Sequence, residues 1–259
     1  MSKKLVNELF KKIDALPAFS KVADKAMIAQ REKSFKESSA DTQGFHDPRF
    51  AKQILQMTNF TAFGFSGHKA GFFESDVLMD EDLLRGVMLA YSVQDFMEKE
   101  LKGYGLQKGE LWQHAMNCAL SCWMIATKTD YPDLEAAFVA GMMHDIGKVL
   151  FDEVLFEEKQ KYADMVNQEG LTPVEAEMAI FGIDHAEIGA LIAEKWDFSN
   201  KIIEAIKYHH QPEKAEKEPD LTTIVHLADF ICVNLNLGFM SGISAIMQSL
   251  DDRGLSNAG

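Results

Sequence analysis

The residues with the clearest chemical potential form the peptide Gly141-Met142-Met143-His144-Asp145-Ile146-Gly147-Lys148. A histidine and an aspartate stand side by side here within an apolar helical pattern. Both groups are costly to bury unless a partner satisfies them. A metal ion does so well, because imidazole nitrogen and carboxylate oxygen both suit zinc, iron and manganese. The peptide therefore predicts a metal site.

Four other segments each place a histidine or an aspartate on the helix face expected to point inward. His114 falls on an apolar stripe with Leu111 and Ile125, and His185 shares a face with Ile188. Seven ligand-type residues exceed what one ion needs, so the pattern favours two metals bridged by a carboxylate, with Asp145 as the natural bridge. Helical periodicity leaves open whether they converge. The candidate ligands are His114, His144, Asp145, His185, His209, His210 and Asp229.

The chain has three cysteines, Cys118, Cys122 and Cys232, which form no framework typical of secreted proteins. Cys118 and Cys122 lie four residues apart on one helix face. A metal role for this pair is one interpretation. A reduced, buried pair is the favoured one, since free cysteine packs as a small hydrophobic side chain.

Helical periodicity dominates the elements that must position these residues, and alternating strand patterns are rare, so we expect an all-α fold. Helices are predicted over about 5–13, 22–28, 80–103, 108–128 and 133–150. Thr172 and Asp184 begin capping boxes, and Ser199 and Asp220 are expected N-caps. A composition shift near 103–108 predicts two helical lobes: an N-terminal lobe (1–105) and a metal-binding core (106–250), followed by a loose tail (251–259).

The charge balance limits the possible partners. A formal net charge of −14 repels both a nucleic-acid backbone and an anionic lipid surface, so we expect neither partner. No stretch reaches the roughly 18 apolar residues that a membrane span requires, and the first residues lack the apolar core of a signal peptide. These patterns predict a cytoplasmic protein.

The order of the candidate ligands resembles the HD superfamily of metal-dependent phosphohydrolases. More narrowly, residues 10–240 resemble the HDOD group, the HD-related output domain of bacterial signalling proteins. The motifs that carry this resemblance are Leu16-Pro17, Asp47-Pro48, Ile54-Leu55-Gln56-Met57-Thr58-Asn59, Ala140 to Gly147, Gly182-Ile183-Asp184-His185-Ala186-Glu187-Ile188-Gly189-Ala190, Trp196 and His209-His210.

The resemblance implies an HD/HDOD-like bundle of two helical lobes with a role in signal output. Many HDOD proteins have lost metal ligands, and this chain retains them, which brings it closer to the active HD enzymes. The implied activity is hydrolysis of a nucleotide or another phosphate ester at a di-metal site of iron, manganese or zinc. One ion would take His114, His144, Asp145 and Asp229, and the other Asp145, His185 and one or both of His209 and His210.

Other residues have weaker assignments. Glu110, one helical turn before His114, is an optional ligand, as in the HD-GYP cyclic-di-GMP phosphodiesterases. However, Gln211-Pro212-Glu213 replaces the Gly-Tyr-Pro signature, so that substrate is not predicted. Lys148 could offset phosphate charge or protonate a leaving group, or could simply be a lysine at a helix C-terminus. Asp184, Glu187 and Tyr208 are predicted hydrogen-bond partners of the histidines, and His226 is placed at the margin of the site. His46 and His68 are predicted not to bind metal. The aromatic segment 60–73 is expected to belong to the core.

Two alternatives remain open on the sequence alone. The chain could be a non-catalytic signalling module in which a metal or ligand is structural and the first lobe contacts a protein partner in trans. A di-iron oxygenase is the less favoured alternative. In the hydrolase interpretation the expected partner is a small phosphorylated ligand.

Overall fold

The computed structural model describes residues 2–19 and 81–234. Within these ranges the regular elements are helices, with one antiparallel bridge between Leu101 and Leu106, so the expected all-α fold is confirmed. The elements are α1 (Ser2–Asp14), α5 (Glu81–Met97), α6 (Glu110–Lys128), α7 (Leu134–Met143), α8 (Lys148–Glu157), α9 (Lys159–Asn167), α10 (Pro173–Phe181), α11 (His185–Lys195), α12 (Asn200–Tyr208), the 3-10 turn η4 (Pro212–Lys214) and α13 (Pro219–Asn234).

Two predicted helices differ from the observed ones. The helix expected to reach residue 103 ends at Met97, and the one expected over 133–150 is two helices, α7 and α8. Between them the backbone bonds shorten from i→i−4 to i→i−3, as Ile146 donates to Met143 and Lys148 donates to Asp145. This tighter turn ends α7 just before the His-Asp pair and places that pair in the connection rather than inside a helix.

The predicted helix starts are partly correct. Thr172 and Glu175 form the expected capping box at α10, and Asp184 accepts from the Glu187 amide at the start of α11. Asp220 is not an N-cap, because α13 already begins one residue earlier at Pro219. The segments 22–28, 33–59, 60–73 and 251–259, together with His46 and His68, lie outside the described residues. The division into two lobes therefore stays a prediction.

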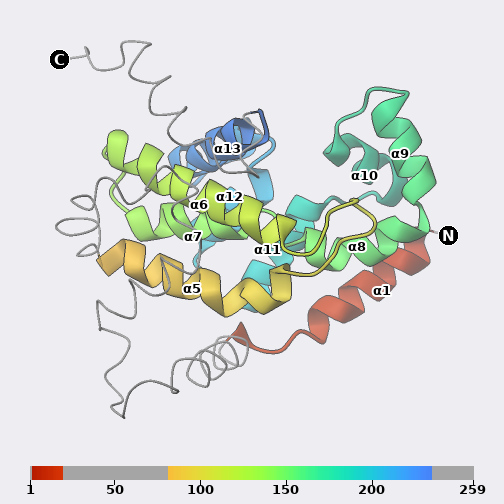
Figure 1. Cartoon of the computed structure of the whole chain (residues 1–259), viewed down its shortest axis with the longest axis horizontal. Coiled ribbons are helices and arrows are strands. Elements are labelled where there is room, and N and C mark those ends of the chain that lie inside the picture. Colours follow the sequence, from red (N-terminus) through yellow and green to blue (C-terminus); the bar gives the residue numbers. More distant parts are fainter. Residues whose placement is uncertain (1, 20–80, 235–259) are drawn as a thin grey trace.

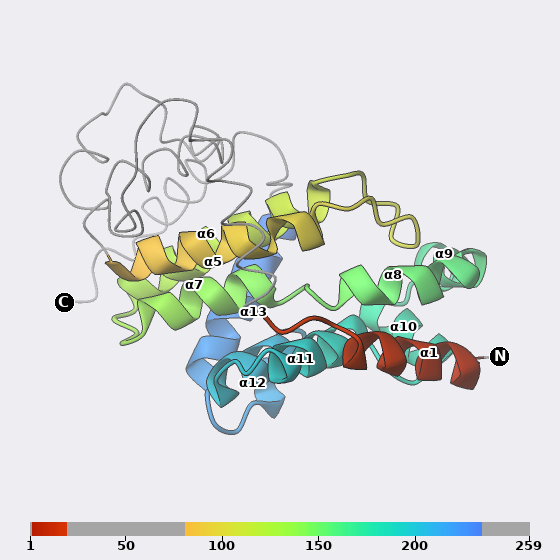
Figure 2. The same ribbon diagram turned by 90° about the horizontal axis from the view of Figure 1, so that it is seen from below.

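The helices gather in two regions. Figures 1 and 2 show α6 and α7 side by side with α5, and α11, α12 and α13 next to them, whereas α1, α8, α9 and α10 lie toward the other end. Helices α6 and α7 lie very close together at Gly141. A Cβ added there would lie 2.9 Å from the Ala119 Cα and 2.6 Å from the Cys122 Sγ. Glycine thus allows these helices to approach closely. None of the described helices is long and apolar enough to cross a membrane.

A candidate di-metal centre

The predicted ligands come from five places in the chain and meet where the two regions join. His114 lies in the second turn of α6, the His144-Asp145 pair in the α7–α8 turn, and His185 at the first position of α11. His209 and His210 follow the end of α12, and Asp229 comes from the middle of α13. Among the described residues they form two adjacent groups, each with ligand atoms within 4.8 Å of one another and each able to hold a metal ion. The first group is His114, Cys118, His144 and Asp229, and the second group is Asp145, His185, His209 and His210.

Asp145 faces both groups, with one carboxylate oxygen toward each. Its Oδ2 lies 3.5 Å from Nε2 of His114 and 3.5 Å from Nε2 of His144. Its Oδ1 lies 3.2 Å from Nε2 of His185 and 3.9 Å from Nε2 of His209. The side chain is 2% exposed, so water cannot take over these contacts. This is the arrangement of a carboxylate that bridges two ions.

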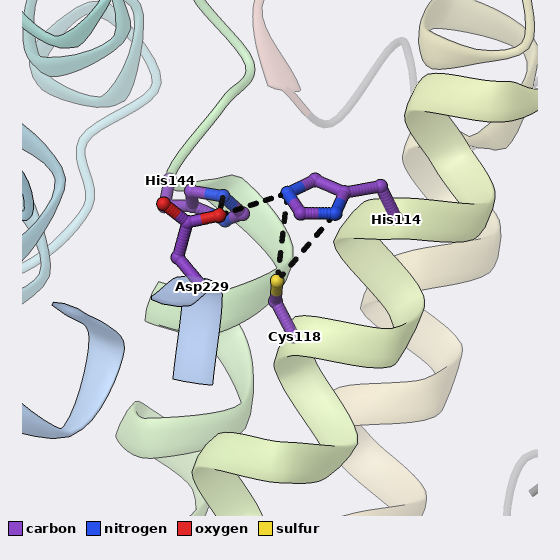
Figure 3. Close-up of side chains that lie close together, drawn as sticks. All are labelled: His114, Cys118, His144 and Asp229. Atoms are coloured by element: carbon purple, nitrogen blue, oxygen red, sulfur yellow. Dashed lines mark hydrogen bonds and ion pairs between the residues drawn. The ribbon is translucent and has the colours of Figure 1, made fainter. Parts of the chain in front are cut away.

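Three of the four nitrogen-to-oxygen separations around the first group are longer than hydrogen bonds, and the fourth, between His114 and Asp229, is a hydrogen-bond distance. His114 Nε2 and His144 Nε2 lie 3.1 and 3.7 Å from Asp229 Oδ1, in addition to their 3.5 Å separations from Asp145. Nitrogen-to-oxygen hydrogen bonds cluster at about 2.7–3.2 Å. Two ligands bound tetrahedrally at roughly 2.0–2.1 Å from one ion lie roughly 3.3–3.4 Å apart. Figure 3 shows the rings of His114 and His144 turned toward the Asp229 carboxylate.

Three buried side-chain nitrogens among the described residues have no hydrogen-bond partner. One belongs to Trp123, and the other two are Nε2 of His144 and Nε2 of His209, whose side chains are completely buried. An unsatisfied buried polar atom costs about 1–3 kcal/mol, so a native fold rarely leaves two of them together. One histidine nitrogen lies beside each oxygen of Asp145. The donor set therefore fits a divalent cation in each group.

Backbone carbonyls orient these two imidazoles. Nδ1 of His144 donates to the Gly141 carbonyl, and Nδ1 of His209 donates to the Ile206 carbonyl, each at 2.7 Å. A carbonyl oxygen only accepts, so the proton must reside on Nδ1. The lone pair of each Nε2 is then free to bind a cation, and the hydrogen bond fixes the ring orientation.

The carboxylates are held in the ionised state that metal binding requires. Burial alone would raise the pKa of Asp145, but Lys148 and the adjacent histidines hold it well below its usual range. Burial opposes ionisation of Asp229 as well. The neighbouring imidazoles of His114 and His144 outweigh it and lower the pKa of that carboxyl far below its ordinary value.

The imidazoles of the second group have pKa values that are shifted in opposite directions. Burial and the neighbouring histidines lower the pKa of His209 well below its usual range and that of His210 to about 3. Burial would also lower the pKa of His185, but Glu177 raises it to about 9. Nε2 of His185 lies 3.0 Å from Nε2 of His210, so the proton on His185 is shared with a neutral neighbour. A cation binding here displaces that proton, which makes its affinity rise with pH.

Glu177 is a functional residue that the sequence reasoning missed. This fully buried side chain on α10 accepts hydrogen bonds from the backbone N–H of His185 at 2.8 Å and from its Nδ1 at 2.7 Å. The Tyr104 hydroxyl donates to the other oxygen at 2.8 Å. The sequence does contain a pattern that identifies Glu177. It shares an apolar helix face with Ala176 and Ile180, and an acid on such a face needs a partner.

The three residues predicted to form hydrogen bonds with the histidines, Asp184, Glu187 and Tyr208, make other contacts. Asp184 caps α11, and Glu187 donates its amide to that cap. The ring of Tyr208 lies beneath the ammonium group of Lys207. His226 supports the site indirectly, because its Nδ1 donates to the His209 carbonyl at 2.8 Å.

Glu110 and Lys148 occupy different surroundings. Glu110 lies in neither group, and its carboxylate accepts from the amide of Gln107, which lies just before the start of α6, at 2.8 Å. The Lys148 ammonium donates to Oδ2 of Asp145 at 2.6 Å and lies 5.7 Å from the centre of the Tyr104 ring. Lys148 is therefore directly beside the bridging carboxylate.

We expect Glu177→Gln to weaken metal binding in the second group by roughly 10–100-fold, the usual effect of losing a carboxylate that orients a histidine ligand. Isothermal titration with zinc would measure the two affinities separately. Glu175→Gln is the matched control, because that residue lies on the same helix, is exposed, and glutamine retains the capping box. Equal zinc affinity in both variants would contradict the role given to Glu177.

Comparisons with known proteins show the family and the fold of the chain. The family model described as "HDOD domain" matches residues 16–212. The chain belongs to the HDOD family. Three solved structures share its fold. An HDOD domain protein of unknown function from Geobacter sulfurreducens is 23% identical, covers 93% of this chain and 80% of that chain, and has a TM-score of 0.60. A protein provisionally named as a phosphohydrolase from Shewanella amazonensis SB2B is 20% identical over 95% of this chain and 94% of that chain, with a TM-score of 0.63, and a protein provisionally named as a signal transduction protein from Marinobacter aquaeolei VT8 is 18% identical over 98% and 60%, with a TM-score of 0.56.

Curated relatives match only in part. An uncharacterized protein of Treponema pallidum is 24% identical over 199 residues, which are 76% of this chain and 37% of that protein. A ribonuclease Y of Lawsonia intracellularis is 31% identical over 117 residues, 45% of this chain and 17% of that protein. The HDOD chain thus spans well under half the length of either relative.

Proposed function

We propose that this HDOD protein is a metal-dependent phosphohydrolase that acts on a nucleotide or another small phosphate ester. The observation that carries the proposal is the pair of Asp145 oxygens, one directed at each group of potential ligands. Divalent cations held this way lower the pKa of a water molecule and polarise a phosphoryl oxygen. Zinc, iron and manganese all suit these nitrogen and oxygen donors.

Lys148 supplies positive charge beside the site. Burial would lower its pKa, but Asp145 and the other nearby carboxylates raise it, so the ammonium stays charged. A lysine with a raised pKa releases its proton reluctantly. We therefore assign Lys148 to offsetting the charge of a bound phosphate rather than to protonating a leaving group.

The substrate is expected to be small. A net charge of −14 disfavours a long polyanion, although the partial relatives include proteins named ribonuclease Y. The structure named as a phosphohydrolase shares the fold at full length and supports the reaction class.

The signalling alternative rests on the HDOD family membership and on the neighbour named as a signal transduction protein. In that case the ions stabilise the fold, and a protein partner recognises the chain in trans. The two functions differ in whether the protein with its metal turns over a phosphate ester.

The test combines metal analysis with an assay. Protein purified without chelator is expected to contain close to two transition-metal ions and to hydrolyse p-nitrophenyl phosphomonoesters or diesters. Lys148→Met should retain the metal and lose about 10²–10³-fold in kcat, whereas Lys159→Met, an exposed lysine on α9, should be unaffected. Full metal content without turnover on either substrate class would favour the signalling module.

A further inference from the structure

The connection between α5 and α6 carries Tyr104 in a tight turn that lies against α8. Leu101 and Leu106 exchange two backbone hydrogen bonds, each 2.9 Å long, which close the turn. The carboxylate of Asp152 accepts from the amides of Gly103 and Tyr104, so the turn is fixed to α8 at the position of the tyrosine. Figures 1 and 2 show this connection extending from the helices toward α8. The backbone of Tyr104 is therefore held in place by a separate element.

The Tyr104 hydroxyl completes the hydrogen bonding of Glu177. It donates to Oε1 at 2.8 Å, while Oε2 accepts from the backbone N–H and Nδ1 of His185. Burial and the Glu177 carboxylate raise the pKa of Tyr104 well above its usual value, so the hydroxyl keeps the proton that it donates. Without that donor Oε1 would lose a hydrogen bond inside the protein, and a buried carboxylate oxygen without a partner is costly. The hydroxyl therefore keeps the carboxylate turned toward His185.

The Tyr104 ring makes a second contact, with the ammonium group of Lys148. That group lies 5.7 Å from the ring centre and 2.6 Å from Oδ2 of Asp145. An ammonium within about 6 Å of an aromatic ring face is attracted by the ring, more strongly where water is excluded. The rings of His185 and of Tyr162 on α9 pack edge-to-face with Tyr104, with centroids 6.4 and 6.3 Å away. These contacts limit the directions in which the Tyr104 ring can turn.

We propose that Tyr104 is a positioning residue of the di-metal site and that it acts through two partners. Its hydroxyl orients His185 through Glu177, and its ring holds the Lys148 ammonium beside Asp145. One side chain thus places both a ligand of the second group and the cation assigned to the substrate phosphate. The part that concerns Lys148 rests on the function proposed above.

A side chain that only fills space would behave differently from this proposal. The two contacts use different parts of Tyr104, so they can be removed one at a time. Tyr104→Phe removes the hydroxyl and keeps the ring, whereas Tyr104→Leu removes both. A purely structural residue would change metal binding and phosphate binding together, because both would follow from a general loss of order.

Two titrations of the full-length protein separate the contacts. Zinc alone would be added to metal-free protein, and inorganic phosphate to zinc-loaded protein from which unbound zinc has been removed. We expect Tyr104→Phe to weaken zinc binding in the second group by roughly 10-fold and to leave the phosphate Kd unchanged. Tyr104→Leu should weaken zinc binding at least as much and also raise the phosphate Kd by roughly 2–30-fold, the range of a cation–π contact. Circular dichroism would establish that each variant is folded.

Tyr131→Phe is the matched control. The Tyr131 hydroxyl also donates to a glutamate, Glu218, at 3.5 Å. Tyr131 follows the C-terminal end of α6, whereas His114 lies near the N-terminal end of that helix. Zinc and phosphate binding in this variant should therefore match those of the native protein.

The outcomes separate this inference from the proposed function. Native zinc affinity in Tyr104→Phe, or the same loss in Tyr131→Phe, would overturn the role of the hydroxyl. An unchanged phosphate Kd in Tyr104→Leu would overturn the role of the ring. The expected pattern in a protein that hydrolyses no phosphate ester would support Tyr104 as a positioning residue and contradict the hydrolase. Native protein that binds no zinc at all would overturn both proposals.

Discussion

Replacing Asp145 by alanine is expected to remove bound metal from both groups and to abolish phosphoesterase turnover. Asp145 directs one carboxylate oxygen toward each group, and the substitution deletes both oxygens. It also leaves the partly buried Lys148 ammonium without its 2.6 Å partner, and this positive charge then repels any incoming cation. Metal content by mass spectrometry and kcat on p-nitrophenyl esters would measure both losses.

The same variant tests whether the metal stabilises the fold. Free metal at about 100 times its Kd stabilises the native state by about 2.7 kcal/mol, which corresponds to a Tm increase of roughly 5–10 °C for a chain of this size. A chelator should therefore lower the Tm of the native protein by that amount and leave the Tm of Asp145→Ala unchanged. Asp220→Ala, an exposed aspartate on α13, should respond to chelator as the native protein does.

The comparison with and without chelator is the informative one. Asp145→Ala is expected to be less stable than the native protein even without metal, because Lys148 and His185 both lose an ion-pair partner. The absolute Tm therefore combines two effects, and only the chelator-dependent difference reports on metal. Identical shifts in the native protein and in Asp145→Ala would show that Asp145 is not needed for the bound metal.

The helical fold and the members of the site follow from local patterns. His114, His185 and Asp229 each share a face with apolar residues, and helical periodicity alone places each on the buried side of its own helix. The turn between α7 and α8 does not follow from such a pattern, because apolar residues continue on both sides of the His144-Asp145 pair. The α7–α8 turn lies close against the start of α11, where a Cβ on Gly147 would be 1.9 Å from the His185 carbonyl oxygen, and this contact is distant in sequence.

Long-range hydrogen bonds account for the other differences. The carboxylate of Asp152 on α8 accepts from the backbone N–H of Gly103 at 2.6 Å and of Tyr104 at 3.3 Å. This holds the chain after α5 in a turn where periodicity predicted more helix, and it brings the Tyr104 hydroxyl to Glu177. Periodicity identifies the buried face of an element, whereas partners some fifty or more residues away in the sequence depend on the tertiary arrangement.

Gly147→Ala is expected to destabilise the protein more than the addition of one methyl group suggests. The backbone angles of Gly147, φ −60° and ψ −30°, suit any residue, so strain within the turn is not the cause. An added Cβ would lie 1.9 Å from the carbonyl oxygen of His185 and 2.6 Å from the amide nitrogen of Gly189. Both are backbone atoms and cannot rotate away. The α7–α8 turn and α11 must therefore separate.

That separation acts on the second group directly. His185 begins α11, and its Nε2 is 3.2 Å from Oδ1 of Asp145, two residues before Gly147. We expect Gly147→Ala to cost about 3 kcal/mol or more in the free energy of unfolding, measured by urea denaturation. Metal analysis should show one ion retained, because His114, His144 and Asp229 do not depend on α11.

Gly189→Ala is the control on the facing helix. Its Cβ would meet a methyl group of Ile206 at 3.0 Å and the Gly147 amide nitrogen at 3.4 Å, and the methyl group can shift by a few tenths of an ångström. This variant should therefore lose far less stability and keep both ions. Equal unfolding free energies for the two variants, or full metal content in Gly147→Ala, would show that the close approach of these two backbones does not position the second group.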